Sequence, residues 1–259
     1  MIIKLYNYIM HYKFLKKIIG AIGFKLIPKN FIKNDRLLSK FSNLSLNKIL
    51  ENLFVGNEIK SIIQIGANDG RRFDDLNKFV KKYKPYVIFV EPIKSYFKEL
   101  KKNYSNQKNL YFENCAVSVK NEINQLYSVK DSKLKFYDDH VVGITSFSKN
   151  HLIKHGIKKK DIIKVDVHSI SMKDLIKKYS IKTLDLIMID AEGYDGMIVI
   201  DLLNTALVRP IIIFEYIHVE NSIFEKCLSL LNEKSYLFFK INENVICIPK
   251  EKSSKSQIL

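Results

Sequence analysis

Short apolar runs alternate with longer segments of helical periodicity from Ser61 onward. The short runs are rich in β-branched and aromatic residues, which is typical of strands, whereas the longer segments repeat their apolar positions at the period of a helix. The predicted strands are 61–65, 86–90, 110–114, 184–189 and 210–215. The predicted helices are 72–83, 92–104, 171–179, 195–204 and 221–232. This alternation predicts an α/β fold with a parallel sheet and helices on both of its faces.

Two further apolar runs follow the last predicted helix. Residues 235–240 and 244–249 are separated by a short polar connection, which predicts a β-hairpin. A mostly parallel sheet with an antiparallel C-terminal hairpin is the Rossmann-like arrangement of class I methyltransferases, whereas nicotinamide-binding Rossmann domains lack the hairpin. Residues 120–165 are polar, and we expect them to form an irregular insert on the substrate side. Residues 251–259 have no periodicity and are expected to be a disordered tail.

The first fifty residues differ from the rest because they mix apolar residues with lysines. No uncharged run reaches the roughly 18 residues that a spanning helix needs, and charged residues also interrupt the core of any signal peptide. Residues 1–50 are therefore predicted to form a helical, basic-amphipathic extension of a domain at 51–250, with Pro28 ending the first helix. The apolar face of this extension either packs on the domain or, through residues 1–30, lies on a membrane surface.

The charge balance raises the question of an anionic partner, because the 259-residue chain carries a net charge of +16. Only four of its 43 basic residues are arginines, the side chain that favours bidentate contacts with phosphates and bases. We therefore expect no nucleic-acid partner, and a lysine-rich bias of the source genome also fits the composition. Cys115, Cys227 and Cys247 are far apart and form no C-x-x-C pair. They argue against a disulfide scaffold or a zinc site and indicate a cytoplasmic protein, with membrane-peripheral attachment as an option.

The segment IIQIGANDG, residues 62–70, is an apolar strand that runs into a glycine-punctuated turn. Its G-x-x-x-G spacing differs from the G-x-G-x-x-G of dinucleotide dehydrogenases, but Gly66 and Gly70 still allow a ligand to approach the backbone closely. Glu91 ends the next predicted strand, where an acidic side chain can accept hydrogen bonds from both hydroxyls of a ribose. Its alternative role is a solvated strand end. Together these features predict a nucleoside site, for which S-adenosylmethionine is the best candidate.

Acidic side chains also follow two later strands. Asp190 and Glu192 lie at the carboxyl end of the strand 184–189, where open α/β sheets bind ligands. They could orient an acceptor hydroxyl, act as general base, balance a positive charge or hold a metal, and the alternative is that one of them caps the next helix. Glu215 is expected beside Asp190, and His218 is a second candidate base because histidine titrates near neutral pH.

The remaining histidines are weaker candidates. His151 and His155 have the i,i+4 spacing of one helix face, but they lack the H-E-x-x-H context, so no metal site is predicted there. His140 and His168 carry no pattern of their own. Whether a divalent metal binds near the carboxylates is left open by the sequence.

Five segments of the chain resemble the FkbM family of S-adenosylmethionine-dependent methyltransferases. They follow the family's order over about residues 60–240, and the segments are IIQIGANDG (62–70), VEP (90–92), NCAVS (114–118), DLIMIDAEGYD (185–195) and IIIFEYIHV (211–219). The resemblance implies that residues 51–250 form a methyltransferase domain with S-adenosyl-L-methionine as its cofactor. It also implies a sugar hydroxyl of a glycan or glycolipid precursor as the acceptor, hence a place in polysaccharide biosynthesis.

The resemblance also assigns residues to the cofactor. Gly66, Asn68 and Gly70 would form the turn that faces the methionine portion, where Asp69 either accepts a hydrogen bond from the ammonium group or serves the turn. Cys115 and Ala116 would wall the adenine pocket, with Cys115 as wall rather than nucleophile.

Asp190 would serve both the cofactor and catalysis, together with Glu192, Glu215 and His218. Thr145 and Ser146 resemble the family's small hydroxyl segment near the active site. The sequence gives no signal for the oligomeric state.

Two other functions compete with this reading. A nicotinamide-dependent oxidoreductase would share the Rossmann-like sheet, but the missing G-x-G-x-x-G and the predicted hairpin both count against it. A non-catalytic basic module for an anionic membrane or nucleic acid is the third hypothesis, and binding that weakens steeply with salt would support it.

Overall fold

The computed structural model describes residues 45–72, 74–138, 143–205 and 207–253. The chain divides into two units, Met1–Ser45 and Leu46–Leu259, and the helices and strands of the described residues all belong to the second. The expected N-terminal extension with Pro28, the contact through residues 1–30 and most of the expected tail lie outside the described residues. Within them, none of the helices combines the length and the apolar character that crossing a lipid bilayer requires.

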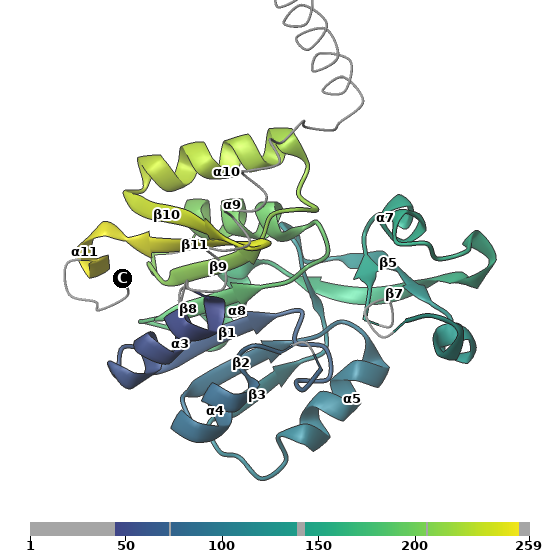
Figure 1. Cartoon of the computed structure of the whole chain (residues 1–259), viewed down its shortest axis with the longest axis horizontal. Helices are drawn as coiled ribbons and strands as arrows, with labels where there is room; N and C mark the ends of the chain where they lie inside the picture. The colour runs from purple at the N-terminus through teal and green to yellow at the C-terminus, as the bar shows by residue number, and fades with distance from the viewer. Residues whose placement is uncertain (1–44, 73, 139–142, 206, 254–259) are drawn as a thin grey trace, which may run out of the picture. The chain divides into compact units, whose positions relative to one another are not determined.

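A seven-stranded sheet forms the centre of the second unit, in the order β10-β11-β9-β8-β1-β2-β3 (Figure 1). The strands β3, β2, β1, β8 and β9 run parallel, and β11 is antiparallel to both of its neighbours. The α/β methyltransferase-type sheet and its C-terminal hairpin are thereby confirmed. The strand bounds are β1 (Ser61–Ile65), β2 (Tyr86–Val90), β3 (Leu110–Glu113), β8 (Leu186–Ile189), β9 (Ile211–Glu215), β10 (Tyr236–Ile241) and β11 (Asn244–Pro249).

Two apolar cores cover the two faces of this sheet. Successive residues of a strand point to opposite faces, so Ile62 joins one core and Ile63 joins the other. Both faces are therefore buried, which explains the uninterrupted apolar runs of the central strands. The first core takes up α3 (Leu46–Val55), α4 (Asn77–Tyr83) and α5 (Lys94–Asn103). The second takes up α8 (Met172–Lys178), α9 (Asp195–Thr205) and α10 (Asn221–Glu233), and the short α11 (Lys250–Ser253) follows β11.

Helix α3 crosses the expected boundary at residue 50. Its apolar stripe, which includes Ile49, Leu50 and Leu53, is fully buried in the first core. The compact unit accordingly begins at Leu46.

The expectation of an irregular insert at 120–165 was wrong. A second sheet forms there in the order β4-β7-β5-β6, with a small core of its own around Leu152. Strand β7 alternates the half-buried Val165 and the buried Val167 and Ser169 with exposed Lys164, Asp166 and His168, and these exposed polar side chains obscured a period-2 strand signal. The bounds are β4 (Ala116–Val117), β5 (Ile123–Val129), β6 (Thr145–Ser146), α7 (Lys149–Lys154) and β7 (Ile162–Ile170), with 3-10 turns η1 (Asp131–Phe136) and η2 (Lys159–Asp161).

Candidate active site

A cavity of about 340 Å³ opens at the carboxyl edge of the seven-stranded sheet. This is the edge at which open α/β sheets bind their ligands. The ends of β1, β2, β8 and β9 supply one wall, and the insert supplies the other. The sequence-predicted residues that line the cavity are Gly66, Asn68, Glu91, Cys115, Ala116, Thr145, Asp190, Glu192 and Glu215.

Gly66 begins the turn after β1 and cannot carry a side chain. Its φ is +75°, and a Cβ atom would lie 1.8 Å from the backbone oxygen of Asp190 on the adjacent strand. The amides of Gly66 and Ala67 both donate hydrogen bonds to the carbonyl of Val90, at 2.9 and 3.1 Å. The turn is therefore clamped between the ends of β8 and β2, and its backbone faces the cavity.

Glu91 lies at the end of β2 and is only 4% exposed. Its two carboxylate oxygens accept hydrogen bonds from the amides of Asn68 and Ile93, each at 2.8 Å. Each oxygen keeps a further lone pair for a ligand in the cavity. Burial raises the pKa of Glu91 to about 7. The solvated strand end that the sequence left open does not describe this side chain.

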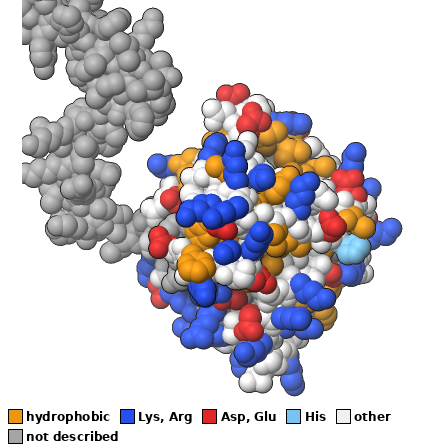
Figure 2. All heavy atoms as spheres, turned by 90° about the vertical axis from the view of Figure 1, so that its right-hand side faces the viewer, with side chains coloured by type: hydrophobic (Ala, Val, Ile, Leu, Met, Phe, Trp, Pro, Cys, Tyr) orange, Lys and Arg blue, Asp and Glu red, His pale blue; other side chains and the backbone are white. Residues whose placement is uncertain are grey.

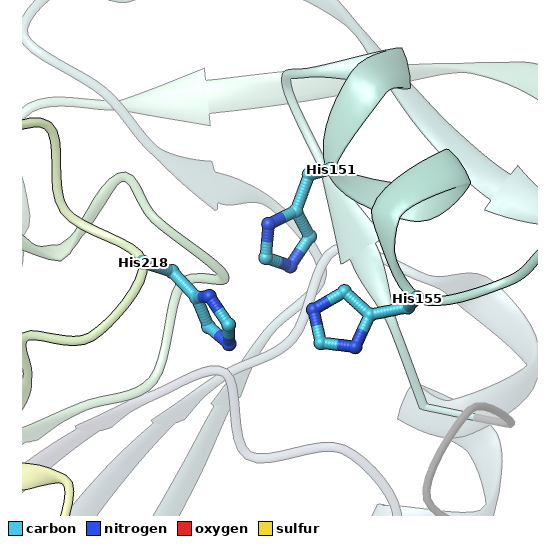
Figure 3. A group of neighbouring side chains, drawn as sticks. All are labelled: His151, His155 and His218. Carbon is cyan, nitrogen blue, oxygen red and sulfur yellow. The ribbon is translucent and has the colours of Figure 1, made fainter. Parts of the chain in front are cut away.

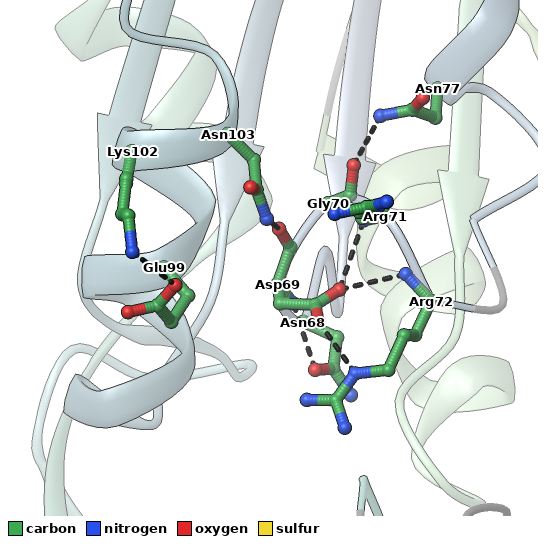
Figure 4. Close-up of polar contacts among 9 residues, drawn as sticks. All are labelled: Asn68, Asp69, Gly70, Arg71, Arg72, Asn77, Glu99, Lys102 and Asn103. Carbon is green, nitrogen blue, oxygen red and sulfur yellow. Dashed lines mark hydrogen bonds and ion pairs between the residues drawn. The ribbon is translucent and has the colours of Figure 1, made fainter.

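Asp69 and Gly70 do not line the cavity. The carboxylate of Asp69 accepts hydrogen bonds from the amides of Arg71 and Arg72, at 2.9 and 2.8 Å, and forms an ion pair with Arg72 Nε at 2.6 Å (Figure 4). Despite the cost of burial, these partners hold the pKa of Asp69 below its usual value. The contacts match the alternative in which Asp69 serves the turn.

Cys115 and Ala116 follow β3 and form an apolar wall of the cavity. Burial raises the pKa of the Cys115 thiol to about 12, so the thiolate that a nucleophile needs is not formed near neutral pH. The side-chain amide of Asn114 donates hydrogen bonds to the carbonyls of Glu91 and Pro92, at 2.9 and 3.0 Å, which ties this wall to the end of β2.

A cluster of carboxylates forms the floor between β8 and β9. Desolvation by the surrounding protein and the charge of Glu192 raise the pKa of Asp190 to about 7, although Asp190 still has surface open to the cavity. Burial and the like charge of Asp190 raise the pKa of Glu215 to about 8. Glu243, in the turn between β10 and β11, adds a further carboxylate to the lining. The cavity of this strongly basic chain is therefore acidic.

Asp195, the first residue of α9, uses its side chain to hold the turn that precedes the helix. Its fully buried carboxylate accepts hydrogen bonds from the amides of Ala191 and Gly193, both at 3.1 Å. These bonds hold the turn between β8 and α9, in which Glu192 adopts a φ of +49°. Asp190 and Glu192 are thus left available to the cavity.

His218 lies beside this floor, in the loop after β9, but does not line the cavity. Burial, together with His151, lowers its pKa, so the neutral ring is favoured near neutral pH. His151 lies within hydrogen-bond distance of Glu192, with 2.8 Å between Nε2 and Oε2. The hydroxyl of Ser146 donates a hydrogen bond to the carbonyl of Glu192 at 2.8 Å, and Thr145 lines the cavity.

Comparison with known proteins identifies the family. A family model described as the methyltransferase FkbM domain matches residues 64–238. The chain belongs to the FkbM methyltransferase family. The resemblance read from the five segments is thereby confirmed, and with it S-adenosylmethionine as the family's cofactor. None of the curated proteins searched matches the chain.

Several solved structures are similar to this one. A methyltransferase FkbM from Methylobacillus flagellatus aligns with 74% of this chain at 10% identity and a TM-score of 0.44, and the match spans 44% of that protein. An O-methyltransferase from Bacillus cereus in complex with SAH aligns with 90% of this chain and 95% of its own, at 10% identity and a TM-score of 0.41. Aeropyrum pernix fibrillarin with bound S-adenosyl-L-methionine aligns with 73% of this chain and 66% of its own, at 7% identity and a TM-score of 0.39.

Sequence reasoning missed several residues of the FkbM-type cavity. Glu243 could have been found, because β10 runs parallel to β9 and the turn that follows it reaches the same edge of the sheet. Leu126 and Phe147 come from the insert, whose strands carry no motif and whose position depends on tertiary packing. Gln64 lines the cavity from within β1, where an apolar neighbourhood gave no sign of a functional side chain.

Proposed function

We propose that this FkbM-family protein transfers the methyl group of S-adenosylmethionine to a hydroxyl oxygen of a sugar in a glycan or glycolipid precursor. The observation that carries the proposal is that one cavity is lined both by Glu91, a buried acid at the end of β2, and by the carboxylates at the ends of β8 and β9. Its volume of about 340 Å³ lies within the range of small-molecule sites.

The residues along the cavity fit the parts of the cofactor. Glu91 can accept hydrogen bonds from the ribose hydroxyls through the lone pairs that the amides of Asn68 and Ile93 leave free. Cys115 and Ala116 offer an apolar wall for the adenine ring. The glycine turn at Gly66 lets the methionine portion approach the backbone.

The carboxylate floor supplies the electrostatics of the reaction. When bound, S-adenosylmethionine supplies an electrophilic methyl group on a positively charged sulfur. Asp190 and Glu192 would balance that charge, and Glu215 is placed to take a proton from an acceptor hydroxyl. Its pKa of about 8 suits a general base that works near neutral pH. Glu215 lines the cavity and His218 does not, so we rank Glu215 first as base.

The insert is the proposed acceptor side of the cavity. It contributes Leu126, Thr145 and Phe147 to the lining, opposite the sheet edge. The segment 120–165 contains ten lysines and five acidic residues. Figure 2 shows basic side chains, lysine or arginine, spread over the face at which the insert lies. Such a surface favours an acceptor that carries phosphate or another negative charge, as a lipid-linked or nucleotide-linked sugar does.

A methyl-transfer assay tests the function. Purified protein is incubated with isotopically methyl-labelled S-adenosylmethionine and a panel of free, nucleotide-linked and lipid-linked sugars. The expected result is label in a sugar methyl ether, reduced at least tenfold by Glu215→Gln with SAH binding unchanged. Transfer to nitrogen or carbon acceptors instead would overturn the proposed acceptor class while leaving the methyltransferase assignment intact.

A further inference from the structure

Three histidine side chains meet just outside the cavity. His151 lies in α7, His155 follows the end of this helix, and His218 lies in the loop after β9 (Figure 3). The ring centroids are 4.6 Å apart for His151 and His155, 4.5 Å for His151 and His218, and 4.9 Å for His155 and His218. The i,i+4 pair, which alone predicts no metal site, thus gains a third ring from a segment more than sixty residues away in the sequence.

The three rings present their nitrogen atoms to one small volume. One ring nitrogen from each histidine lies within 4.8 Å of those of the other two. Three imidazole ligands with an open fourth position form a common site for divalent zinc, and imidazole also suits copper and nickel. Helical spacing places His151 and His155 on one face, so small side-chain rotations bring the nitrogens to the separation that a shared metal requires.

We propose that His151, His155 and His218 bind a divalent transition metal of the zinc class. The site draws on two parts of the fold, because α7 belongs to the insert and the loop after β9 belongs to the seven-stranded sheet. No residue of the proposed site falls in the segments that the structure leaves undescribed.

Glu192 is the positioning residue of this site. Its Oε2 atom lies 2.8 Å from Nε2 of His151, and the two side chains are only 22% and 10% exposed. A metal-binding histidine characteristically donates its other N–H to a carboxylate, which fixes the orientation of the ring. Glu192 also lines the cavity, so the metal site and the active site share one side chain.

The metal would fasten the insert to the sheet edge. Two other contacts at this junction are the hydrogen bond from Ser146 to the Glu192 carbonyl and the packing of Phe147 on Tyr194, whose ring centroids are 4.6 Å apart. A bound ion adds ligand bonds from both sides and so fixes the wall that faces the acceptor. The proposal does not rest on methyl transfer, because metal binding is measured without cofactor or acceptor.

Cobalt titration tests the site directly. Co²⁺ is titrated into chelator-treated full-length protein, and visible d–d absorption reports a site with nitrogen ligands and low coordination number. We expect one equivalent to bind to the wild type and Zn²⁺ to displace it. His155→Phe keeps a ring in the packed cluster but removes the ligand, so it should weaken binding at least tenfold. His168→Phe, an exposed histidine of β7, is the matched control and should bind like the wild type.

Two further measurements separate a metal site from a packed cluster of rings. Glu192→Gln should weaken cobalt binding by about 10- to 100-fold and keep the absorption bands, as expected for a residue that orients a ligand. Zn²⁺ should raise the melting temperature of the wild type and leave that of His155→Phe unchanged, because only an ion bound to the folded state stabilises it. No cobalt bands in folded wild type, or equal binding by His155→Phe, overturns the proposal. Loss of SAH binding alone would count against the proposed function and leave the metal site standing.

Discussion

The two walls of the cavity are built in different ways. The sheet wall consists of strand ends whose polar groups are held by backbone hydrogen bonds, as when the amides of Asn68 and Ile93 hold Glu91. The insert wall rests on a separate four-stranded sheet and meets the first through side chains such as Ser146, Phe147 and His151. A wall whose geometry is fixed by the sheet topology suits the cofactor, because every reaction of the enzyme uses the same one. A wall attached by a few side chains suits an acceptor, because it can vary without disturbing the sheet.

Disruption of the sheet wall should have the largest effect, and Gly66→Ala tests it. The new Cβ would meet the Asp190 carbonyl at 1.8 Å, so a strand end must shift. We expect SAH affinity to fall more than 100-fold, measured by calorimetry, with a marked loss of stability in urea. Gly156→Ala is the control: its φ of +81° gives similar strain, about 1–2 kcal/mol, but no atom lies within 4 Å. Equal losses in both variants would show that strain, and not the strand contact, decides the outcome.

The negative charge of the carboxylate floor should have the second-largest effect. It should make the affinity for S-adenosylmethionine, relative to that for SAH, depend on pH. Asp190 and Glu215 have pKa values of about 7 and 8, so their negative charge grows as the pH rises through this range. S-adenosylmethionine carries a sulfonium and SAH does not. We therefore expect the affinity for S-adenosylmethionine relative to SAH to rise about tenfold, or about 1.4 kcal/mol, between about pH 6 and pH 9. Asp190→Asn should reduce that rise, and a ratio independent of pH in the wild type would contradict the role of the floor.

The same carboxylates should make stability depend on pH. Their pKa values in the folded protein lie above the ordinary values, so the folded state retains protons that the unfolded chain releases above about pH 4. The free energy of unfolding should consequently fall as the pH rises from about 5 to about 8. Glu215→Gln should flatten this fall in urea titrations at a series of pH values. An unchanged fall in the variant would mean that Glu215 is already ionised in the folded protein over this pH range.

The junction with the insert should give a smaller effect that spares the cofactor. Ser146→Ala removes the hydrogen bond to the Glu192 carbonyl, worth about 1 kcal/mol. We expect the KM for the acceptor to rise about fivefold, with SAH affinity within twofold of the wild type. Ser169→Ala is the matched control, because the hydrogen-bond partners of its hydroxyl all lie in the segment 120–124: the carbonyls of Lys120 and Glu122, the amide of Glu122 and the side chain of Asn124. If Ser146→Ala weakens SAH binding as strongly as it raises KM, the two walls are not separable.

Surface charge on the insert should have the smallest effect. Lys158 and Lys159 are exposed, and their joint replacement by glutamine removes positive charge near the proposed acceptor side. For a charged acceptor we expect kcat/KM to fall two- to threefold at low salt and to be unchanged at high salt, where exposed charges are screened. Lys81→Gln/Lys82→Gln, on α4, should show no such salt dependence.

The contrast between the walls also explains what the sequence could predict. The strands of the main sheet are continuous apolar runs, and parallel strands bring their carboxyl ends together, so Glu91, Asp190 and Glu215 could be assigned to one edge. The insert could not be read in this way, because its strands are half-exposed and interrupted by charged residues such as Lys164 and Asp166.

Contacts between distant segments were the other limit. In the sequence, nothing distinguishes Asp69 from the other residues of the glycine turn. Only the structure shows that its carboxylate accepts hydrogen bonds from the amides of Arg71 and Arg72 and forms an ion pair with Arg72. His218 was considered alone as a base, since nothing in the sequence connects it with the helix that carries His151.

The central claim is that Glu91 and the glycine turn form a cofactor site, and one titration tests it most directly. SAH is titrated calorimetrically into folded wild type, Glu91→Gln and Glu113→Gln, the last changing an acid at the end of β3 that does not line the cavity. The account predicts one SAH bound per chain, a 10- to 100-fold loss in Glu91→Gln and wild-type affinity in Glu113→Gln, since hydrogen bonds to a charged group contribute about 1.5–3 kcal/mol. Absence of binding to the wild type, or equal affinity in Glu91→Gln, would contradict it.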